Sequence, residues 1–173
     1  PVGKGGSAVR AKLLSAAAAA LMIGLSLLTL PLVLPRLLGF QVYSVLTPSM
    51  VPALPVGSAI YTRSCNPEEL AEGAIITFSL GSATELVEVH RVVQNDTQKG
   101  EITTKGDANA QPDVTPVAYG RITGEVLFSI PLLGAVSAAL HSVGGIVVCI
   151  AIFALACLLW AFADKIKKRE RFK

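Results

Sequence analysis

The chain has 173 residues, of which 52% are hydrophobic and only 16% are charged, and its formal net charge is +3. The positive charge lies in the tails, because the stretch from Phe40 to Ile130 carries five basic and ten acidic residues. An acidic middle region argues against nucleic acid as a partner, and apolar residues gathered at the two ends indicate membrane anchoring rather than an unusually large core.

The first apolar segment runs without a charge from Leu13 to Pro35. As a helix it would be about 35 Å long, enough to span a bilayer core of about 30 Å. Basic residues precede it, as they do in a cleaved secretory signal, but the apolar core of such a signal is usually about 7–15 residues long. We therefore predict a basic N-terminus over 1–12 and a retained transmembrane helix over 13–36, with Pro31 and Pro35 marking its exit end.

The next segment, Tyr43–Gly57, contains three prolines and the candidate nucleophile Ser49. It is too rich in proline for a helix or a strand interior, so we expect a stiff loop. The apolar residues after Ser49 leave two interpretations open: they face lipid beside the site, or they pack in a small core. They are Met50, Val51, Leu54 and Val56.

The middle region reads as short strands separated by turn residues. The predicted strands are Gly57–Arg63, Ala74–Leu80, Glu85–Gln94, Glu101–Lys105 and Tyr119–Phe128, with one helical turn at Pro67–Leu70. In the third strand, Leu86, Glu88, His90 and Val92 face one way, and the residues between them face the other. A compact, mainly β domain over 40–130 is therefore expected.

The second apolar stretch extends from Ile130 to Ala163, interrupted only by His141, and is best suited to span a membrane over 143–163. A basic tail, 164–173, follows. Because basic residues flank both spans, the positive-inside rule places both tails on the cytoplasmic side and the middle domain outside. His141 is expected to pack in or near the second span, without an identified role.

Two residues of the middle domain suit nucleophilic chemistry. A serine hydroxyl needs a base to act as a nucleophile near neutral pH, and an imidazole suits that task. His90 is the only histidine of the middle domain, 40–130. Taken separately, Ser49 reads as a turn residue and His90 as a structural one; their combination is what points to chemistry.

A loop rich in Gly, Asn and Pro, TKGDANAQPD, supplies two carboxylates, Asp107 and Asp113. One of them could orient the imidazole, and the other could cap its own loop. Metal ligation is not expected, because one His, one Cys and scattered carboxylates lack ligand spacing. No phosphate-binding loop is present either, so no cofactor is predicted. With one of the three cysteines in the middle domain, no disulfide framework is expected.

Four segments in this order resemble type I signal peptidase. They are Thr47-Pro48-Ser49-Met50-Val51-Pro52, Val89-His90-Arg91-Val92-Val93, Thr104-Lys105-Gly106-Asp107-Ala108-Asn109 with Asp113 beyond, and Gly120-Arg121-Ile122-Thr123-Gly124. Histidine stands where the bacterial branch has lysine, which is similar to the branch found in the endoplasmic reticulum, archaea and some Gram-positive bacteria. Pro48 replaces the usual glycine before the serine. The resemblance covers about residues 40–133.

The resemblance implies a signal-peptidase/LexA-like β fold flanked by two transmembrane helices. It implies that Ser49 attacks the scissile carbonyl and that His90 acts as general base. Asp113 matches the acidic partner of the histidine best, while Asp107 braces the loop or shares that role. The Thr47 hydroxyl and the Ser49 backbone N–H match the oxyanion hole.

The implied substrates are secretory pre-proteins with small residues before the cut, and the implied location is the cell membrane, or the endoplasmic reticulum membrane of a eukaryote. The alternative function is a non-catalytic, membrane-anchored β domain that binds peptides or partner proteins. The geometry of Ser49 and His90 distinguishes the two. A self-cleaving repressor would need a DNA-binding domain in place of the membrane spans.

Overall fold

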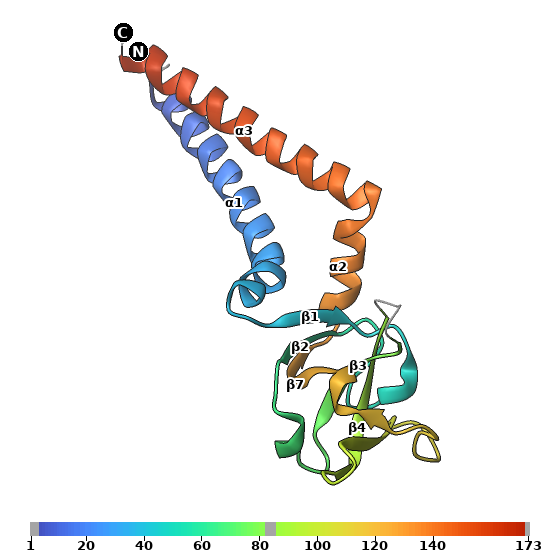
Figure 1. Ribbon diagram of the computed structural model, residues 1–173. Coiled ribbons are helices and arrows are strands. Elements are labelled where there is room, and N and C mark those ends of the chain that lie inside the picture. The colour runs from blue at the N-terminus through green and yellow to red at the C-terminus, as the bar shows by residue number, and fades with distance from the viewer. Residues whose placement is uncertain (1–3, 82–85, 172–173) are drawn as a thin grey trace. The chain divides into compact units, whose positions relative to one another are not determined.

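The computed structural model describes residues 4–81 and 86–171. The chain divides into two compact units, one formed by residues 1–33 and 139–173 and the other by residues 34–138. The second unit is a mostly antiparallel β half-barrel, and two long apolar helices occupy the ends of the chain (Figure 1). This is the predicted fold class.

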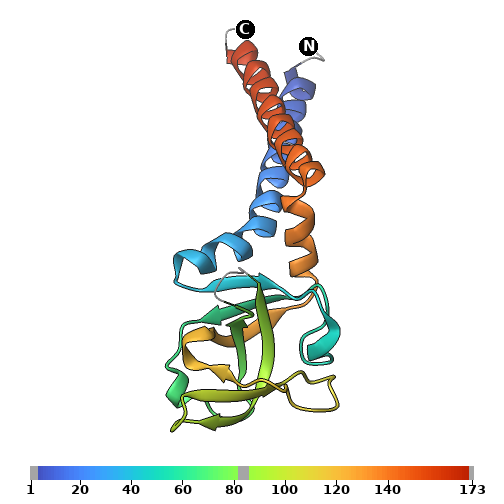
Figure 2. The ribbon, with the colours of Figure 1, turned by 45° about the vertical axis from the view of Figure 1, so that its right-hand side comes forward.

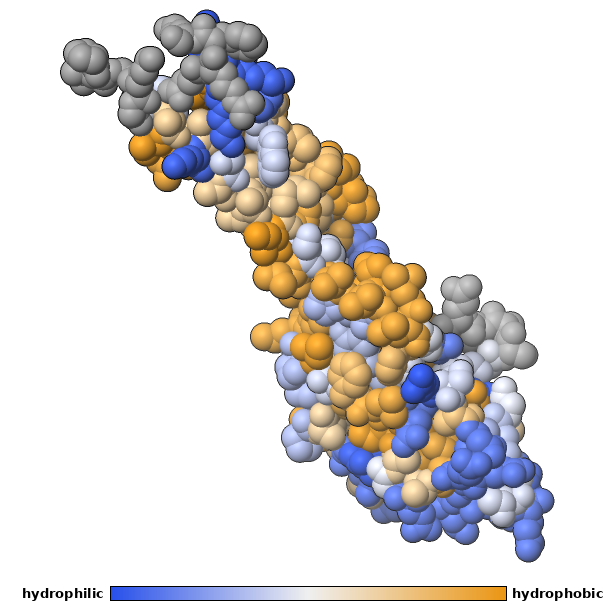
Figure 3. All heavy atoms as spheres, turned by 90° about the vertical axis from the view of Figure 1, so that its left-hand side faces the viewer, coloured by the Kyte–Doolittle hydropathy of each residue, from blue (hydrophilic) through white to orange (hydrophobic). Residues whose placement is uncertain are grey.

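The helical unit holds most of α1 (Lys4–Leu37) and all of α3 (Val143–Arg171). Both helices are long and apolar enough to cross a membrane, and apolar side chains cover them (Figure 3). Their buried side chains include the alanines Ala11 and Ala18 in α1 and Ala156 and Ala163 in α3. Small residues at such positions let two helix backbones approach closely.

The end of α1 lies beyond its prolines. Pro31 and Pro35 are inside the helix, which continues to Leu37. The stop comes at Gly39, whose φ of +83° is a left-handed conformation that glycine adopts readily. The Gly39 N–H donates to the Arg36 carbonyl and the Phe40 N–H to the Pro35 carbonyl, which is a Schellman cap.

The sheet contains seven strands in the order β1-β2-β7-β3-β4-β5-β6, and every neighbouring pair is antiparallel (Figure 2). The strands are β1 (Gln41–Ser44), β2 (Ala59–Arg63), β3 (Ile75–Ser79), β4 (Val87–Asp96), β5 (Glu101–Lys105), β6 (Val117–Ala118) and β7 (Ile122–Ile130). Three 3₁₀ turns connect them: η1 (Pro48–Met50), η2 (Pro67–Glu69) and η3 (Tyr119–Arg121).

Each face of the sheet has its own apolar cluster. On one face the cluster is built from Leu70, Ile76, Phe78, Val92, Ile102 and Val117. On the other it is built from Val45, Met50, Leu54 and Ile60, with Ile75 and Val89 packed against it. Neighbouring residues such as Ile75 and Ile76 belong to different clusters, as strand alternation requires.

One predicted strand begins later in the structure than expected. The strand expected from Tyr119 begins at Ile122 instead, because Tyr119 starts the turn η3. Its N–H bonds to the Gly100 carbonyl and its hydroxyl donates to Asn95 Oδ1, which holds it against the β4–β5 turn. The second apolar stretch forms α2 (Leu133–His141) and α3, and α3 begins at residue 143, where the second span was expected to begin.

Candidate active site

The turn that carries Ser49 is fixed from below by apolar packing. Met50, which follows Ser49, has no exposed surface, and Leu54 is buried in the same cluster. The Val51 N–H donates to the Pro48 carbonyl and the Leu54 N–H to the Met50 carbonyl. Ser49 stays partly exposed above these anchors. Of the four apolar residues with two possible environments, Met50 and Leu54 are core residues, whereas Val51 and Val56 are exposed.

Thr47 precedes this turn in an extended conformation, with φ −116° and ψ 154°. This is the conformation expected of a residue before proline. Its side chain is exposed, and its Oγ1 lies 3.3 Å from Ser49 Oγ, so the two hydroxyls share a hydrogen bond. The predicted oxyanion donor and the predicted nucleophile therefore point to the same side of the turn.

His90 is in the middle of β4, opposite Ile76 of β3, and only 3% of it is exposed. Its Nδ1 lies 2.6 Å from Asp113 Oδ2. The Thr104 hydroxyl donates to the same carboxylate oxygen at 2.6 Å, and the Asp113 N–H donates to the Thr104 carbonyl at 2.8 Å. The ring, the carboxylate and the hydroxyl form one short chain of hydrogen bonds.

The contact with Asp113 assigns the proton of the neutral ring. A carboxylate accepts hydrogen bonds, so Nδ1 carries the hydrogen and Nε2 keeps a lone pair. Nε2 is buried and has no hydrogen-bond partner among the residues that the structure describes. The nearest carboxylate oxygen, Glu88 Oε1, is 3.6 Å away, too far for a hydrogen bond. Such an atom is suited to accept a proton from a hydroxyl.

Gly106 lies against the turn that carries Ser49. Thr104 lies on the His90 face, because both side chains reach Asp113. Gly106 follows the end of β5, two residues after Thr104. A Cβ added to Gly106 would come within 2.7 Å of the Ser49 carbonyl oxygen, and the Ala108 N–H donates to that oxygen at 2.8 Å. The turn η1 also contacts β4.

Asp107 contacts the side chain of Arg91 instead of the His90 ring. Arg91 Nε donates to Asp107 Oδ1 at 2.8 Å and Arg91 Nη2 to Asp107 Oδ2 at 2.6 Å. The same guanidinium donates to the Gly73 carbonyl through Nη1 at 2.7 Å. The hydrogen bonds to Asp107 raise the pKa of Arg91. This bidentate pair ties the loop after β5 to β4 and leaves Asp113 as the carboxylate at His90.

Sequence reasoning assigned no role to Thr104, Gly106 or Glu88. The first two stand in the segment TKGDAN. The partner of Thr104 is nine residues further on, across a loop, and no local pattern reveals that contact. Strand alternation predicts that Glu88 lies on the His90 face. The distance between its carboxylate and His90 Nε2 follows only from the structure.

The β unit contains a hydroxyl, an imidazole and a carboxylate, which are the groups that nucleophilic acyl transfer uses. Among residues 4–81 and 86–171, no three His, Cys, Asp or Glu side chains gather in a way that could hold a metal ion.

No protein-family model matches the chain. The chain is similar to Signal peptidase I W of Bacillus subtilis (strain 168), with 36% identity over 88 residues. The match covers 49% of this chain and 45% of that protein, so the chain spans less than half the length of this relative. This similarity supports a membrane-associated signal peptidase at the level of the family.

Proposed function

We propose that the chain is a membrane-anchored serine endopeptidase of the Ser–His type of signal peptidase I. One observation carries the proposal. Among the described residues, the buried ring of His90 is held at Nδ1 by Asp113 and keeps Nε2 without a partner, and its strand β4 is contacted by the turn that carries Ser49. The partial similarity to a signal peptidase supports the same reading.

In the proposed mechanism, Ser49 Oγ attacks the carbonyl carbon of the scissile bond while His90 Nε2 takes the hydroxyl proton. Asp113 holds the ring and stabilises the imidazolium that forms. Nε2 then returns the proton to the leaving nitrogen as the C–N bond breaks. A water molecule, activated by the same nitrogen, hydrolyses the acyl-enzyme and restores the serine.

The Thr47 hydroxyl and the Ser49 N–H are the proposed oxyanion donors, and the loss of one such donor costs about 3–4 kcal/mol of transition-state stabilisation. Asp107 has a bracing role in this proposal, through Arg91. The substrates are secretory pre-proteins with small residues before the cut. An extended peptide would add to the sheet, with pockets that read alternate side chains.

The location is part of the proposal. The two helices span the membrane, the basic tails are cytoplasmic, and the β domain is outside. At that position the site meets a substrate whose apolar helix ends at the outer surface of the bilayer. In a eukaryotic cell the corresponding membrane would be the endoplasmic reticulum.

The test is cleavage of a pre-protein by the purified full-length chain in detergent. Ser49→Ala and His90→Ala are each expected to lower the initial rate by at least about 10³-fold, because the two groups act as one unit. Ser64→Ala is the matched control, since Ser64 is exposed in the loop after β2, and its rate should equal that of the wild type. A fluorophosphonate probe should label the wild type and spare Ser49→Ala.

A full cleavage rate in His90→Ala would remove the imidazole from the mechanism. If the wild type neither cleaves the pre-protein nor reacts with the probe, the chain is instead an anchored β domain that binds peptides. Circular dichroism of each variant checks that the sheet is intact.

A further inference from the structure

A groove of about 780 Å³ opens beside the candidate active site. Glu88, Asp113 and Ala108 line this groove. The apolar side chains of Phe78, in β3, and of Leu80, just after β3, line it as well. Ala108 is also the residue whose N–H holds the Ser49 carbonyl. One wall of the groove is therefore continuous with the nucleophile turn, and the mechanism above gives the groove no role.

Glu88 is the charged group of this groove that is available to a ligand. It lies two residues before His90 on the same face of β4, and 37% of its side chain is exposed. The other carboxylate, Asp113, is occupied by His90 and Thr104. The guanidinium of Arg121 in the same wall donates through Nε and Nη2 to the Ser79 carbonyl.

The position of Glu88 fixes which part of a substrate it would meet. During acyl transfer the leaving nitrogen must come within hydrogen-bond reach of the atom that gives it a proton, about 3 Å. That atom is His90 Nε2, and Glu88 Oε1 lies 3.6 Å from it. The acyl half of the substrate stays bonded to Ser49. The group that arrives beside Glu88 is therefore the amine of the leaving segment.

We propose that the groove binds the polypeptide on the C-terminal side of the cut, and that Glu88 holds its newly formed terminal amine. This inference rests on the proposed function. In the step concerned, the Ser49 Oγ–C bond forms, the C–N bond breaks, and the hydroxyl proton passes through Nε2 to the leaving nitrogen. The free amine then takes a second proton from water, and the resulting ammonium pairs with the Glu88 carboxylate.

The same contact operates in reverse, because a site that releases an amine also receives one. An acyl-enzyme can be attacked by water or by the amine of an added peptide, and occupancy of the groove favours the peptide. The ratio of aminolysis to hydrolysis reports on the groove. It is independent of how much of the enzyme is active, so a loss of folded protein does not change it.

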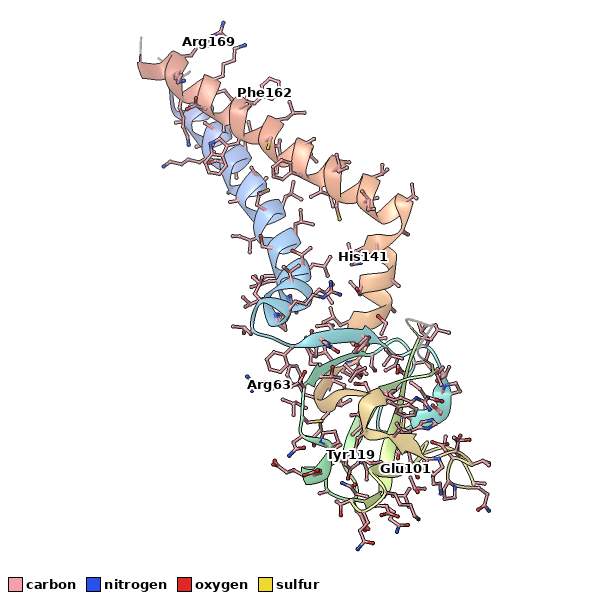
Figure 4. The ribbon with its side chains drawn as sticks, in the orientation of Figure 1. Arg63, Glu101, Tyr119, His141, Phe162 and Arg169 are labelled. Carbon is pink, nitrogen blue, oxygen red and sulfur yellow. The ribbon has the colours of Figure 1, made fainter. Side chains whose placement is uncertain are left out.

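The experiment uses the full-length protein in detergent, with a short peptidyl thioester ending in alanine as acyl donor and a tetrapeptide amide as acceptor. Glu88→Gln keeps the shape and removes the charge. The aminolysis-to-hydrolysis ratio is expected to fall about three- to fivefold, the range of a partly exposed ion pair. Glu101→Gln, in β5 beside Tyr119 (Figure 4), should leave the ratio unchanged.

A second variant tests the groove itself. Ala110 lines the groove with an exposed side chain, so Ala110→Trp fills it without entering the core. Capture of the tetrapeptide amide should fall, while capture of a single amino-acid amide, which reaches only the Glu88 end, should persist. Equal loss for both acceptors would overturn the assignment of the groove.

The outcomes separate this inference from the proposed function. If the wild type forms no acyl-enzyme from the thioester, the proposed function fails. If an acyl-enzyme forms but Glu88→Gln has the wild-type ratio, Glu88 does not meet the leaving amine. Equal losses of hydrolysis and aminolysis in Glu88→Gln would mean that the carboxylate acts through His90 alone, which also overturns the inference.

Discussion

A single carboxylate oxygen, Asp113 Oδ2, accepts hydrogen bonds from both His90 and Thr104 at 2.6 Å. The two donors come from neighbouring strands, β4 and β5, so the oxygen is held at one position relative to the sheet. The ring of His90 is thereby fixed in both orientation and tautomer. The burial of Thr104, which has no exposed surface, adds rigidity to this arrangement.

Asp113→Asn is therefore expected to lower kcat by about 10²–10⁴-fold with little change in KM, because an amide can present its NH₂ group to the ring and favour the wrong tautomer. Thr104→Val removes one donor and keeps the shape, so a smaller loss of about tenfold is expected. Steady-state cleavage of a pre-protein measures both. An Asp113→Asn variant as fast as the wild type would contradict the role of this carboxylate.

A second residue-scale prediction concerns Cys65, a free thiol that is partly buried against the apolar cluster of Leu70 and Ile76. Burial, and after it the charge of Glu125, raises the pKa of Cys65. A raised pKa leaves less thiolate at pH 8, and the thiolate is the nucleophile. Cys65 should therefore react with iodoacetamide roughly two- to fivefold more slowly than a thiol at the exposed neighbour in Ser64→Cys.

Glu125→Gln removes the second cause and should speed the alkylation of Cys65. Mass spectrometry of the peptide that contains residue 65 follows the reaction without interference from the cysteines of α3. A slower reaction in Glu125→Gln would mean that the carboxylate does not act on the thiol through its charge.

At the level of elements, alternation predicted the central strands. The pattern in β4 put Glu88, His90 and Val92 on one face, and the structure has them there because β4 pairs with strands on both sides. The strands β1 and β6 span four and two residues. Strands this short are too short to show a pattern of alternating apolar and polar residues. The helix boundary at Ser142 is marked by a cap, since Ser142 Oγ accepts a hydrogen bond from the Gly145 N–H.

The candidate site was predictable in its members but not in its pairing. Ser49, His90 and two aspartates could be found from residue types and from family resemblance. The choice between Asp107 and Asp113 depends on which face each one reaches across the loop after β5. Arg91 captures Asp107 on one face, and Asp113 reaches His90 on the other. Neither contact has a regular sequence spacing.

This loop gives an element-scale prediction. The bidentate contact of Arg91 with Asp107 holds the loop whose Ala108 N–H supports Ser49. Asp107→Asn should weaken that contact, lower the free energy of unfolding by about 1–3 kcal/mol, and reduce kcat about tenfold by loosening the nucleophile turn. Denaturant unfolding and cleavage assays measure the two effects.

The matched control is Asp96→Asn, which breaks an exposed ion pair with Lys99 in the β4–β5 turn. Surface pairs contribute little to stability, so both stability and kcat should stay near the wild-type values. If the two aspartate variants behave alike, the loop does not depend on the contact with Arg91.

At the scale of the whole molecule, charge and hydropathy divide the chain in the same way as the fold does. The middle region is acidic, whereas the residues that follow the apolar part of α3 are largely basic. Basic residues resist translocation across a membrane, and their position sets the orientation of the spans. The proposed orientation therefore places both tails on the cytoplasmic side and the β domain on the opposite side.

Labelling of single cysteines by a membrane-impermeant maleimide in intact cells tests this orientation. In a background of Cys65→Ser, Cys149→Ser and Cys157→Ser, a thiol from Ser64→Cys in the β domain should be labelled from outside. A thiol from Lys168→Cys, in the last turns of α3, should react only after the membrane is opened. The two positions are both exposed, so a difference in labelling reports the side of the membrane and not burial. Labelling of Lys168→Cys in sealed cells would place the tail outside. The chain would then cross the membrane once or in the inverted orientation, and the proposed orientation would be wrong.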